Sequence, residues 1–328
     1  MRPGYAGGVL IGIPHMTDNP TFSVIVPTYN RQSSVHACLQ SLAQQNYPAA
    51  GFEVVVVDDG SSPPVRDTSR AEIRKMNLIL LRSPQNEGPA AARNRGASCA
   101  RGRYLAFTDD DCRPDANWLA GLESALAVAP ASAAGGHMID GGGDLFSAAS
   151  HSILEASYDH YNETGGTPRF FASLNLAVPT KEFREVGGFL PEFRTSEDRE
   201  FCARWLRHGH SLVFAPDAVV VHKSPDGLRP FLRRHYHYGK GAYRFRTLQA
   251  KYRKRRMELE PSVFYWQLIR HPLAKHAGMR GVGISFLVAV SQIASFLGFL
   301  AERRHAKRAH GASALRTPPA AGGWMGTD

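Results

Sequence analysis

Four short, continuous runs of apolar residues constrain the fold of this chain most. They cover residues 22–26, 52–57, 78–81 and 104–107, and segments of helical composition lie between them. A strand that is apolar at every position is buried on both faces, which is typical of a parallel sheet with helices on both sides. The alternation therefore predicts an α/β fold with a mostly parallel central sheet.

The pattern is weaker further along the chain. Residues 170–178 favour a strand, and two short runs at 213–214 and 218–221 favour two more. Residues 196–209 favour a helix, because acidic residues in its first turn suit the positive end of a helix. The glycine-rich residues 135–144 indicate no particular element.

Charge is distributed unevenly along the 328 residues. Residues 1–228 hold 20 Lys and Arg against 25 Asp and Glu, whereas residues 229–328 hold 19 against 4. A basic C-terminal part favours an anionic partner, either a membrane surface or a nucleic acid. No nucleic-acid module is recognisable, so no nucleic acid is expected. We expect a globular domain over 21–228, a basic helical extension over 229–310, a flexible N-terminus over 1–20 and a disordered tail over 311–328.

Cysteine usage indicates a reducing compartment. The four cysteines are scattered and form no Cys-x-x-Cys pair. This argues against a zinc site and against a disulfide framework.

Three consecutive aspartates, Asp109 to Asp111, directly follow the fourth apolar run. Adjacent carboxylates repel one another, so a fold keeps such a cluster beside a cation or fully solvated. A solvated acidic turn is the plain alternative. Ligands of open parallel sheets bind at the carboxyl ends of the strands, and Thr28 and Asp59 follow two other strands. These groups together predict a nucleotide site, and without a glycine-rich phosphate loop the phosphates need a metal and basic side chains.

Seven motifs follow one another along the chain: VPTYN (Val26–Asn30), VVVDDGS (Val55–Ser61), NEGPAAARNRG (Asn86–Gly96), FTDDDC (Phe107–Cys112), NLAVP (Asn175–Pro179), VGGF (Val186–Phe189) and SEDREFCARW (Ser196–Trp205). In this order they resemble the family 2 glycosyltransferases, and the resemblance covers about residues 22–222. It implies a GT-A type nucleotide-binding sandwich that transfers a sugar, with inversion, from a nucleotide diphosphate-sugar to an acceptor hydroxyl.

The resemblance implies how the donor would be bound. Thr28 and Asp59 would contact the base and the ribose, with Pro27, Asn30 and Asp110 in the same nucleotide-sugar site. Asp59 has an alternative role in turn chemistry, because Asp-Gly is a common turn dipeptide.

Arg93 would approach the nucleotide from the helix after the third strand, unless it lies on a solvated helix face. Asp109 and Asp111 match the Asp-x-Asp pattern of the family. Asp109 would lie near the ribose and the metal, and Asp111 would bind Mg²⁺ or Mn²⁺, ions that prefer oxygen ligands. His222 matches a further metal ligand of some members, or is only the polar end of a strand.

Asp198 is the candidate general base, because an inverting displacement needs a carboxylate to take the proton of the acceptor. Glu197 could exchange roles with it, and capping of a helix is the structural alternative for both. Asn175 would face the sugar or the acceptor, or be a core amide.

A single-addition enzyme is expected rather than a processive polymerase. Arg204-Trp205 lies inside the helix of the Glu-Asp pair, and no later Gln-x-x-Arg-Trp motif follows. We expect a role in cell-envelope or polysaccharide synthesis, with a glycan or a lipid-linked acceptor. An inactive nucleotide-sugar-binding scaffold and a nucleotidyltransferase are the alternatives.

Residues 281–301 form an uncharged stretch long enough to span a bilayer. Basic residues flank both of its ends, whereas a spanning helix prefers its positive flank inside. A hairpin, an in-plane insertion, a buried core helix and a helix at a homo-oligomer interface are therefore alternatives to a span. We expect the protein on the cytoplasmic side of the cell membrane, either peripheral or held by this single segment.

Overall fold

The structure is a computed structural model that describes residues 19–66, 73, 76–162, 166–224 and 227–309. Apart from residues 19 and 20, the N-terminal and C-terminal segments predicted to be flexible or disordered lie outside the described residues.

One mixed sheet forms the centre of the molecule. Its strands β3, β2, β1 and β4 are parallel, as are β6 and β8, whereas β7 runs antiparallel to β4 and β6, and β5 runs antiparallel to β8. The order across the sheet is β3-β2-β1-β4-β7-β6-β8-β5. The strands are β1 (Phe22–Thr28), β2 (Phe52–Asp58), β3 (Leu78–Arg82), β4 (Tyr104–Phe107), β5 (Cys112–Pro114), β6 (Ala133–Asp140), β7 (Leu176–Pro179) and β8 (Leu212–His222).

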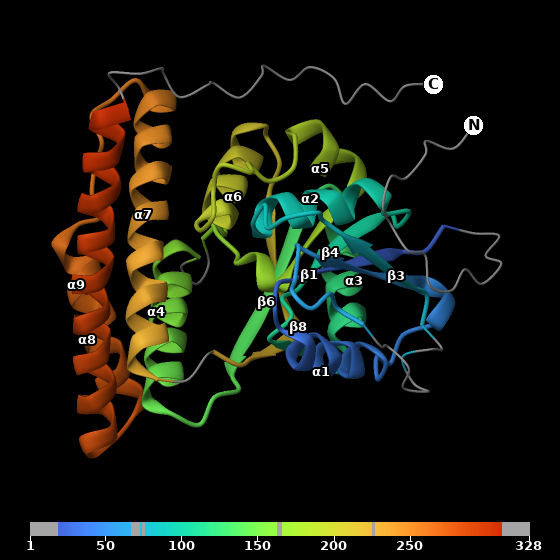
Figure 1. Cartoon of the computed structure of the whole chain (residues 1–328), viewed down its shortest axis with the longest axis horizontal. Coiled ribbons are helices and arrows are strands. Elements are labelled where there is room, and N and C mark those ends of the chain that lie inside the picture. Colours follow the sequence, from blue (N-terminus) through green and yellow to red (C-terminus); the bar gives the residue numbers. More distant parts are fainter. Residues whose placement is uncertain (1–18, 67–72, 74–75, 163–165, 225–226, 310–328) are drawn as a thin grey trace.

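Helices cover both faces of this sheet and form a further layer beside it. Figure 1 shows α2, α5 and α6 on one side of the sheet and α1 and α3 on the other. The long helices α7, α8 and α9 stand at the edge of the molecule, with α4 between them and the sheet. The helices are α1 (Gln32–Leu42), α2 (Pro89–Cys99), α3 (Trp118–Val128), α4 (Leu145–Tyr161), α5 (Thr180–Val186), α6 (Glu197–Arg207), α7 (Leu228–Arg253), α8 (Ser262–Lys275) and α9 (Gly278–Ala309).

Continuous apolar sequence explains the first strands, since every residue of β1, β2 and β4 is buried. The strand predicted over 170–178 is wrong in its first part. Only Leu176–Pro179 pairs in the sheet, and Ser173–Asn175 forms a 3₁₀ turn before it. The amide of Asn175 anchors this turn, because it donates to the backbone oxygens of His137 and Ala218.

The two short strands predicted at 213–214 and 218–221 are one strand, β8. A bulge hid its continuity, since the pairing with β6 jumps from Gly136–Ala215 to His137–Val219. The glycine-rich stretch that indicated no element contains most of β6. Gly136 is required there because a Cβ atom would lie 1.9 Å from the backbone oxygen of Ala218.

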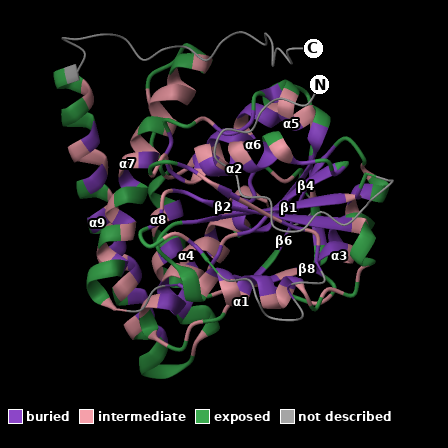
Figure 2. Cartoon of the chain, turned by 45° about the vertical axis from the view of Figure 1, so that its right-hand side comes forward, coloured by how far each residue is buried: buried purple, intermediate pink, exposed green. Residues whose placement is uncertain are grey.

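A second apolar cluster holds the outer helices together. It joins buried residues of α4, α7, α8 and α9, among them Ala149, Phe231, Leu268 and Val288. Figure 2 shows that the helices of this layer carry both buried and exposed residues along their lengths. This second cluster is separate from the core of the sheet. Helix α4 contributes to the second cluster, although α4 precedes residue 228, where the globular domain was predicted to end.

Candidate active site

Strand register brings the predicted polar groups to one edge of the sheet. Thr28 at the end of β1 pairs with Asp58 at the end of β2, and Ile25 pairs with Phe107 at the end of β4. The loops after these three strands face one cavity of about 1170 Å³. The predicted site residues that line this cavity are Pro27, Thr28, Asp59, Arg93, Asp109, Asp110, Asp111, Glu197, Asp198 and His222.

The three consecutive aspartates have three different environments. Asp110 is buried, and it accepts hydrogen bonds from the Thr28 hydroxyl (2.7 Å) and from Nη1 of Arg31 (2.9 Å). Burial raises the pKa of Asp110 to about 6 although Arg31 opposes this. Asp110 therefore holds β1 and β4 together at the floor of the site.

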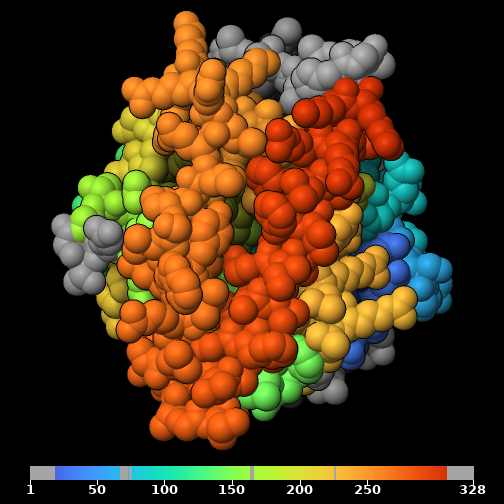
Figure 3. All heavy atoms as spheres, turned by 90° about the vertical axis from the view of Figure 1, so that its left-hand side faces the viewer, coloured from blue at the N-terminus to red at the C-terminus, as the bar shows by residue number. Residues whose placement is uncertain are grey.

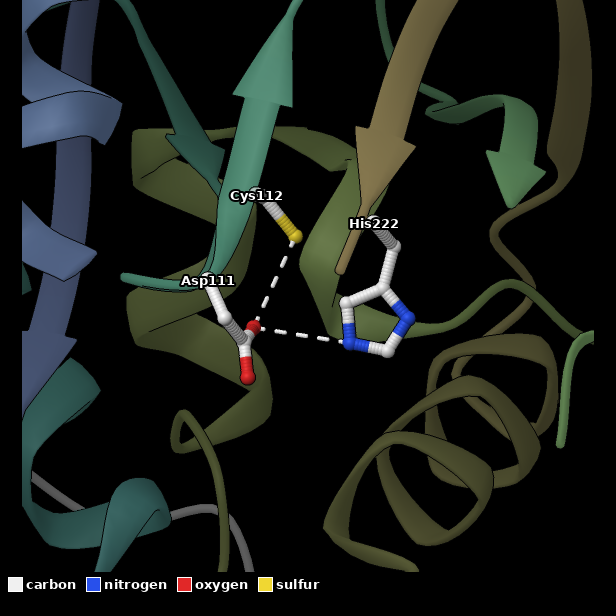
Figure 4. Close-up of side chains that lie close together, drawn as sticks. All are labelled: Asp111, Cys112 and His222. Carbon is white, nitrogen blue, oxygen red and sulfur yellow. Dashed lines mark hydrogen bonds and ion pairs between the residues drawn. The ribbon is translucent and has the colours of Figure 1, made fainter. Parts of the chain in front are cut away.

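Asp111 lies against His222, as Figure 4 shows. The pairing of Cys112 with His222 between β5 and β8 places the two side chains together. Oδ1 of Asp111 lies 3.4 Å from Nε2 of His222, and Oδ2 lies 2.7 Å from Nη1 of Arg31. Burial raises the pKa of Asp111, but the hydrogen bond and charge of His222 and the charge of Arg31 outweigh it, and the pKa falls to about 2.

This donor set fits a hard divalent ion. A carboxylate that stays ionised and an imidazole nitrogen are suitable ligands for Mg²⁺ or Mn²⁺. The sulfur of Cys112 is also within 4.8 Å of both groups. Burial raises the pKa of the Cys112 thiol well above its ordinary value, and a neutral thiol is a poor ligand for a hard ion. Asp109 is not part of this cluster of described residues.

Arg93 is a buried clamp rather than a solvated residue of a helix surface. Its side chain is only 2% exposed, and the guanidinium reaches Oδ1 of Asp109 at 2.5 Å and Oε1 of Glu197 at 2.9 Å. Burial lowers the pKa of Arg93, but the charges of Asp109 and Glu197 raise this pKa by more than burial lowers it. The guanidinium therefore stays charged. Arg93 therefore ties the end of β4 to the start of α6.

Asp198 follows Glu197 in the first turn of α6 and faces the same cavity. Its Oδ1 accepts a hydrogen bond from the backbone N–H of Arg199 at 2.7 Å. Burial, and next the charge of Glu197, raise the pKa of Asp198 to about 7. Since Glu197 is paired with Arg93, Asp198 is the carboxylate of the two that can exchange a proton near neutral pH.

Two of the predicted residues do not line the cavity. Asn30 connects loops: its backbone N–H donates to the Ser61 hydroxyl, and its Oδ1 accepts from the backbone N–H of Ser62. Asn175 is fully buried, and its Oδ1 accepts from the indole of Trp118. The prediction that Asn175 faces the sugar or acceptor is therefore corrected, because all of its amide contacts are to the core.

Asp59 has the turn role that the sequence left as an alternative. Its carboxylate accepts hydrogen bonds from the backbone N–H groups of Glu87 (3.0 Å) and Gly88 (2.8 Å). It thereby holds the loop that leads into α2, while it also lines the cavity.

Sequence reasoning missed several residues that line the cavity. Arg31 directly follows the VPTYN motif and pairs with Asp110 and Asp111, so its position beside that motif was an available signal. Arg234 and His235 come from α7, and the basic, aromatic composition of that segment indicated only a charged helix.

Comparison with known proteins gives consistent results. The family model described as "Glycosyl transferase family 2" matches residues 23–187. A glycosyltransferase of Haloferax volcanii, AglE, is 30% identical over 231 residues, which are 68% of this chain and 73% of that protein. The pre-mycofactocin glycosyltransferase of Mycobacterium tuberculosis is 28% identical over 67% of this chain, but the match spans only 46% of its own length.

Among solved structures, the mannosyltransferase PcManGT of Pyrobaculum calidifontis, in complex with GDP-Man and Mn²⁺, is similar in fold. Its TM-score is 0.56 at 20% identity, and the match covers 94% of this chain and 80% of that one. The predicted GT-A type fold is thereby confirmed.

Proposed function

The chain belongs to glycosyltransferase family 2, and we propose that it moves a sugar, with inversion, from a nucleotide diphosphate-sugar to the hydroxyl of an acceptor. One observation carries the proposal: the carboxylate of Asp198, with its pKa near neutrality, faces the same cavity as the Asp111–His222 pair. A proton acceptor and a cluster that suits a cation are the two parts that such a transfer needs.

In the proposed reaction the acceptor oxygen attacks the anomeric carbon on the face opposite the leaving diphosphate. The new bond is between that oxygen and the anomeric carbon, and the bond that breaks joins this carbon to the diphosphate oxygen. Asp198 takes the hydroxyl proton, and the nucleoside diphosphate leaves with the electron pair. Arg93 holds Glu197 and Asp109 in place around this event.

A divalent cation would be held by Asp111 and His222, with Asp109 nearby in the same cavity. When bound, such an ion neutralises charge on the diphosphate as a Lewis acid. The structure of PcManGT in complex with GDP-Man and Mn²⁺ supports this assignment. Thr28, Asp59 and Asp110, with the neighbouring Pro27 and Asn30, remain the proposed surroundings of the nucleotide.

We propose a single-addition enzyme. Arg204 is engaged in a buried ion pair with Glu200, and the indole of Trp205 donates to the backbone oxygen of Ser211. Both residues therefore stabilise α6, which supports the view that Arg204-Trp205 is not the Arg-Trp of the Gln-x-x-Arg-Trp motif expected of a processive polymerase.

We also propose that the helical extension lies on the cytoplasmic face of the membrane, where a role in envelope or polysaccharide synthesis would place it. Within the described residues, α9 is the helix that is long and apolar enough to cross a bilayer. Less than half of its most apolar stretch is buried inside the protein, so much of that stretch is open to an apolar surrounding. It packs closely along α7, since a Cβ atom on Gly298 would lie 1.9 Å from the backbone oxygen of Tyr236. This packing favours in-plane contact through what we call the apolar face, which consists of Val263, Trp266, Leu273, Met279, Val282, Phe286, Ile293, Phe296 and Leu297.

Residue 228 remains our proposed boundary between catalytic domain and extension, and α7 begins at Leu228. Because α4 shares the apolar cluster of the extension, we expect the two parts to fold together.

The test of this function is donor turnover by the full chain. UDP-, GDP- and dTDP-sugars are supplied with Mn²⁺ and candidate glycan or lipid-linked acceptors, and released nucleoside diphosphate is measured. Asp198→Asn should keep donor binding and lose about 10²–10⁴-fold in turnover, the range that general base catalysis contributes. The exposed Asp217→Asn is the control. Binding of a donor without turnover in the unmodified protein would support the inactive scaffold instead.

A further inference from the structure

The cavity of the active site continues into the helical layer. Beyond Asp111 and Asp198 it is lined by apolar side chains from α4, α8 and α9, which we call the apolar arm: Leu154, Phe264, Leu268, Ile293 and Phe296. The whole cavity, about 1170 Å³, is larger than typical small-molecule sites of about 300–1,000 Å³. A nucleotide-sugar is polar and binds through hydrogen bonds and charges. Its binding therefore explains the polar end of the cavity but not the apolar arm.

The apolar arm opens on the outside of the molecule. Ile293 and Phe296 line the cavity and are also exposed, as is Leu259 in the connection between α7 and α8. Figure 3 shows this face, where the surface is hollowed between the orange segment that contains α8 and the red helix α9. Ile293 and Phe296 belong to the apolar face, so the cavity opens within the surface proposed to meet the membrane.

A buried polar side chain from α7 also lines this cavity. His235 on α7 is buried and lines the cavity, and its Nε2 has no hydrogen-bond partner among the described residues. Burial, and next the charge of Arg234, lower the pKa of His235 to about 3, so the imidazole is neutral. A buried polar atom without a partner is costly, and a polar group of a ligand would remove that cost.

Resting on the proposed transferase function, we propose that the acceptor is an amphiphile with a hydroxyl-bearing head and one hydrocarbon chain. The head lies between Asp198 and His235, and the hydroxyl oxygen bonds to the anomeric carbon as its proton passes to Asp198. The chain fills the apolar arm and leaves the protein between α8 and α9. The head of such an acceptor reaches the active site while its hydrocarbon chain stays in contact with the bilayer.

The test uses alkyl β-glucosides as probes, from methyl through hexyl and octyl to decyl, below their micelle-forming concentrations. Binding to the full chain is measured by titration calorimetry. Each buried methylene contributes enough that affinity should rise about tenfold for every two carbons. The increase should stop once the chain reaches the opening, because further carbons gain no protein contact.

Two matched variants separate the apolar arm from the outer surface. Ile293 and Phe286 both lie on α9 and are 63% and 66% exposed, but only Ile293 lines the cavity. Ile293→Asp should weaken octyl glucoside binding about tenfold or more, since it puts a charge at the opening. Phe286→Asp should change it by no more than about twofold, as expected for a surface site.

Affinity independent of chain length would overturn the proposal, as would equal effects of the two variants. Donor binding and release of nucleoside diphosphate are measured on the same samples. A protein that turns over a donor but shows no chain-length dependence refutes the amphiphilic acceptor alone. A protein that binds the glucosides but no donor refutes the transferase function instead.

Discussion

At the residue scale, three carboxylates carry the site, and their surroundings give them different proton affinities. The pKa of Asp111 falls to about 2, that of Asp110 rises to about 6 and that of Asp198 rises to about 7. Such separation supports the proposed roles, in which Asp111 stays ionised to hold a cation and Asp198 takes and returns a proton. The acid triplet is visible in the sequence, but the partners that separate its members come from distant elements.

The raised pKa of Asp198 predicts how activity depends on pH. A base works only when deprotonated, and the pKa of about 7 lies well above the usual range of aspartate. We expect kcat/KM to rise about tenfold per pH unit below this value and to level off above it. A pH profile of donor turnover at saturating Mn²⁺ measures this. The variant Asp110→Asn should show the same rise of kcat/KM below this pKa, because the rise comes from Asp198. A flat profile between about pH 5 and 8 would exclude Asp198 as the base.

At the element scale, the connection of β4 to α6 depends on one buried cation. Arg93 pairs with Asp109 and Glu197, which lie 16 and 104 residues away in the chain. The sequence showed a basic residue on an alanine-rich helix, which is compatible with solvent exposure. The structure shows that this side chain is buried and paired with Glu197 at the start of α6.

Replacement of Arg93 should therefore destabilise the fold. Arg93→Met leaves two carboxylates without their partner, and breaking a buried pair costs about 3–5 kcal/mol. Arg95 on the same helix is the matched control, because its side chain is 38% exposed and pairs with the half-buried Glu87. Arg95→Met should cost at most about 1 kcal/mol. Urea unfolding measures both, and similar losses for the two variants would contradict the clamp.

The sequence was a good guide to elements where local pattern and packing agree. Continuous apolar runs gave β1 and β2 with nearly their full lengths, since both faces of these strands are buried. It failed at β8, where a bulge interrupts the pattern. At Asn175 the sequence left two roles open, and the structure has the core amide, whose partners are Trp118 and two backbone oxygens from other strands. The short strand β5, which sets His222 beside Asp111, is too brief to leave a periodic signal.

At the scale of the whole molecule, the basic extension is an outer layer that helps to build the cavity. It supplies Arg234 and His235 to the site and presents the apolar face outward. The residues of the apolar face are exposed apolar side chains of α8 and α9, and exposed apolar side chains that gather on one surface mark interaction sites. Basic residues such as Arg270, Lys275 and Arg280 belong to the same two helices and suit anionic lipid headgroups.

The apolar face predicts membrane binding that depends on both lipid charge and aromatic anchors. Flotation with vesicles should show binding to anionic vesicles that weakens with salt. The double variant Trp266→Ser with Phe286→Ser should lose at least about tenfold in binding, since each side chain buries considerable apolar area. Val128→Ser removes an exposed apolar side chain on α3, outside the apolar face, and should have little effect. Absence of vesicle binding together with a stable dimer in sedimentation would mean that a second copy covers the face.

The central claim is a cation-assisted donor site built on Asp111, and donor binding tests it most directly. Calorimetry with UDP-, GDP- and dTDP-sugars is run on the full chain with Mn²⁺ and with EDTA, and is repeated on Asp111→Asn. The account predicts that at least one donor binds with Mn²⁺, and that EDTA and the variant each weaken this binding about tenfold or more. Binding that is equally strong with EDTA and in the variant would contradict it, as would the absence of binding by every donor to a folded sample.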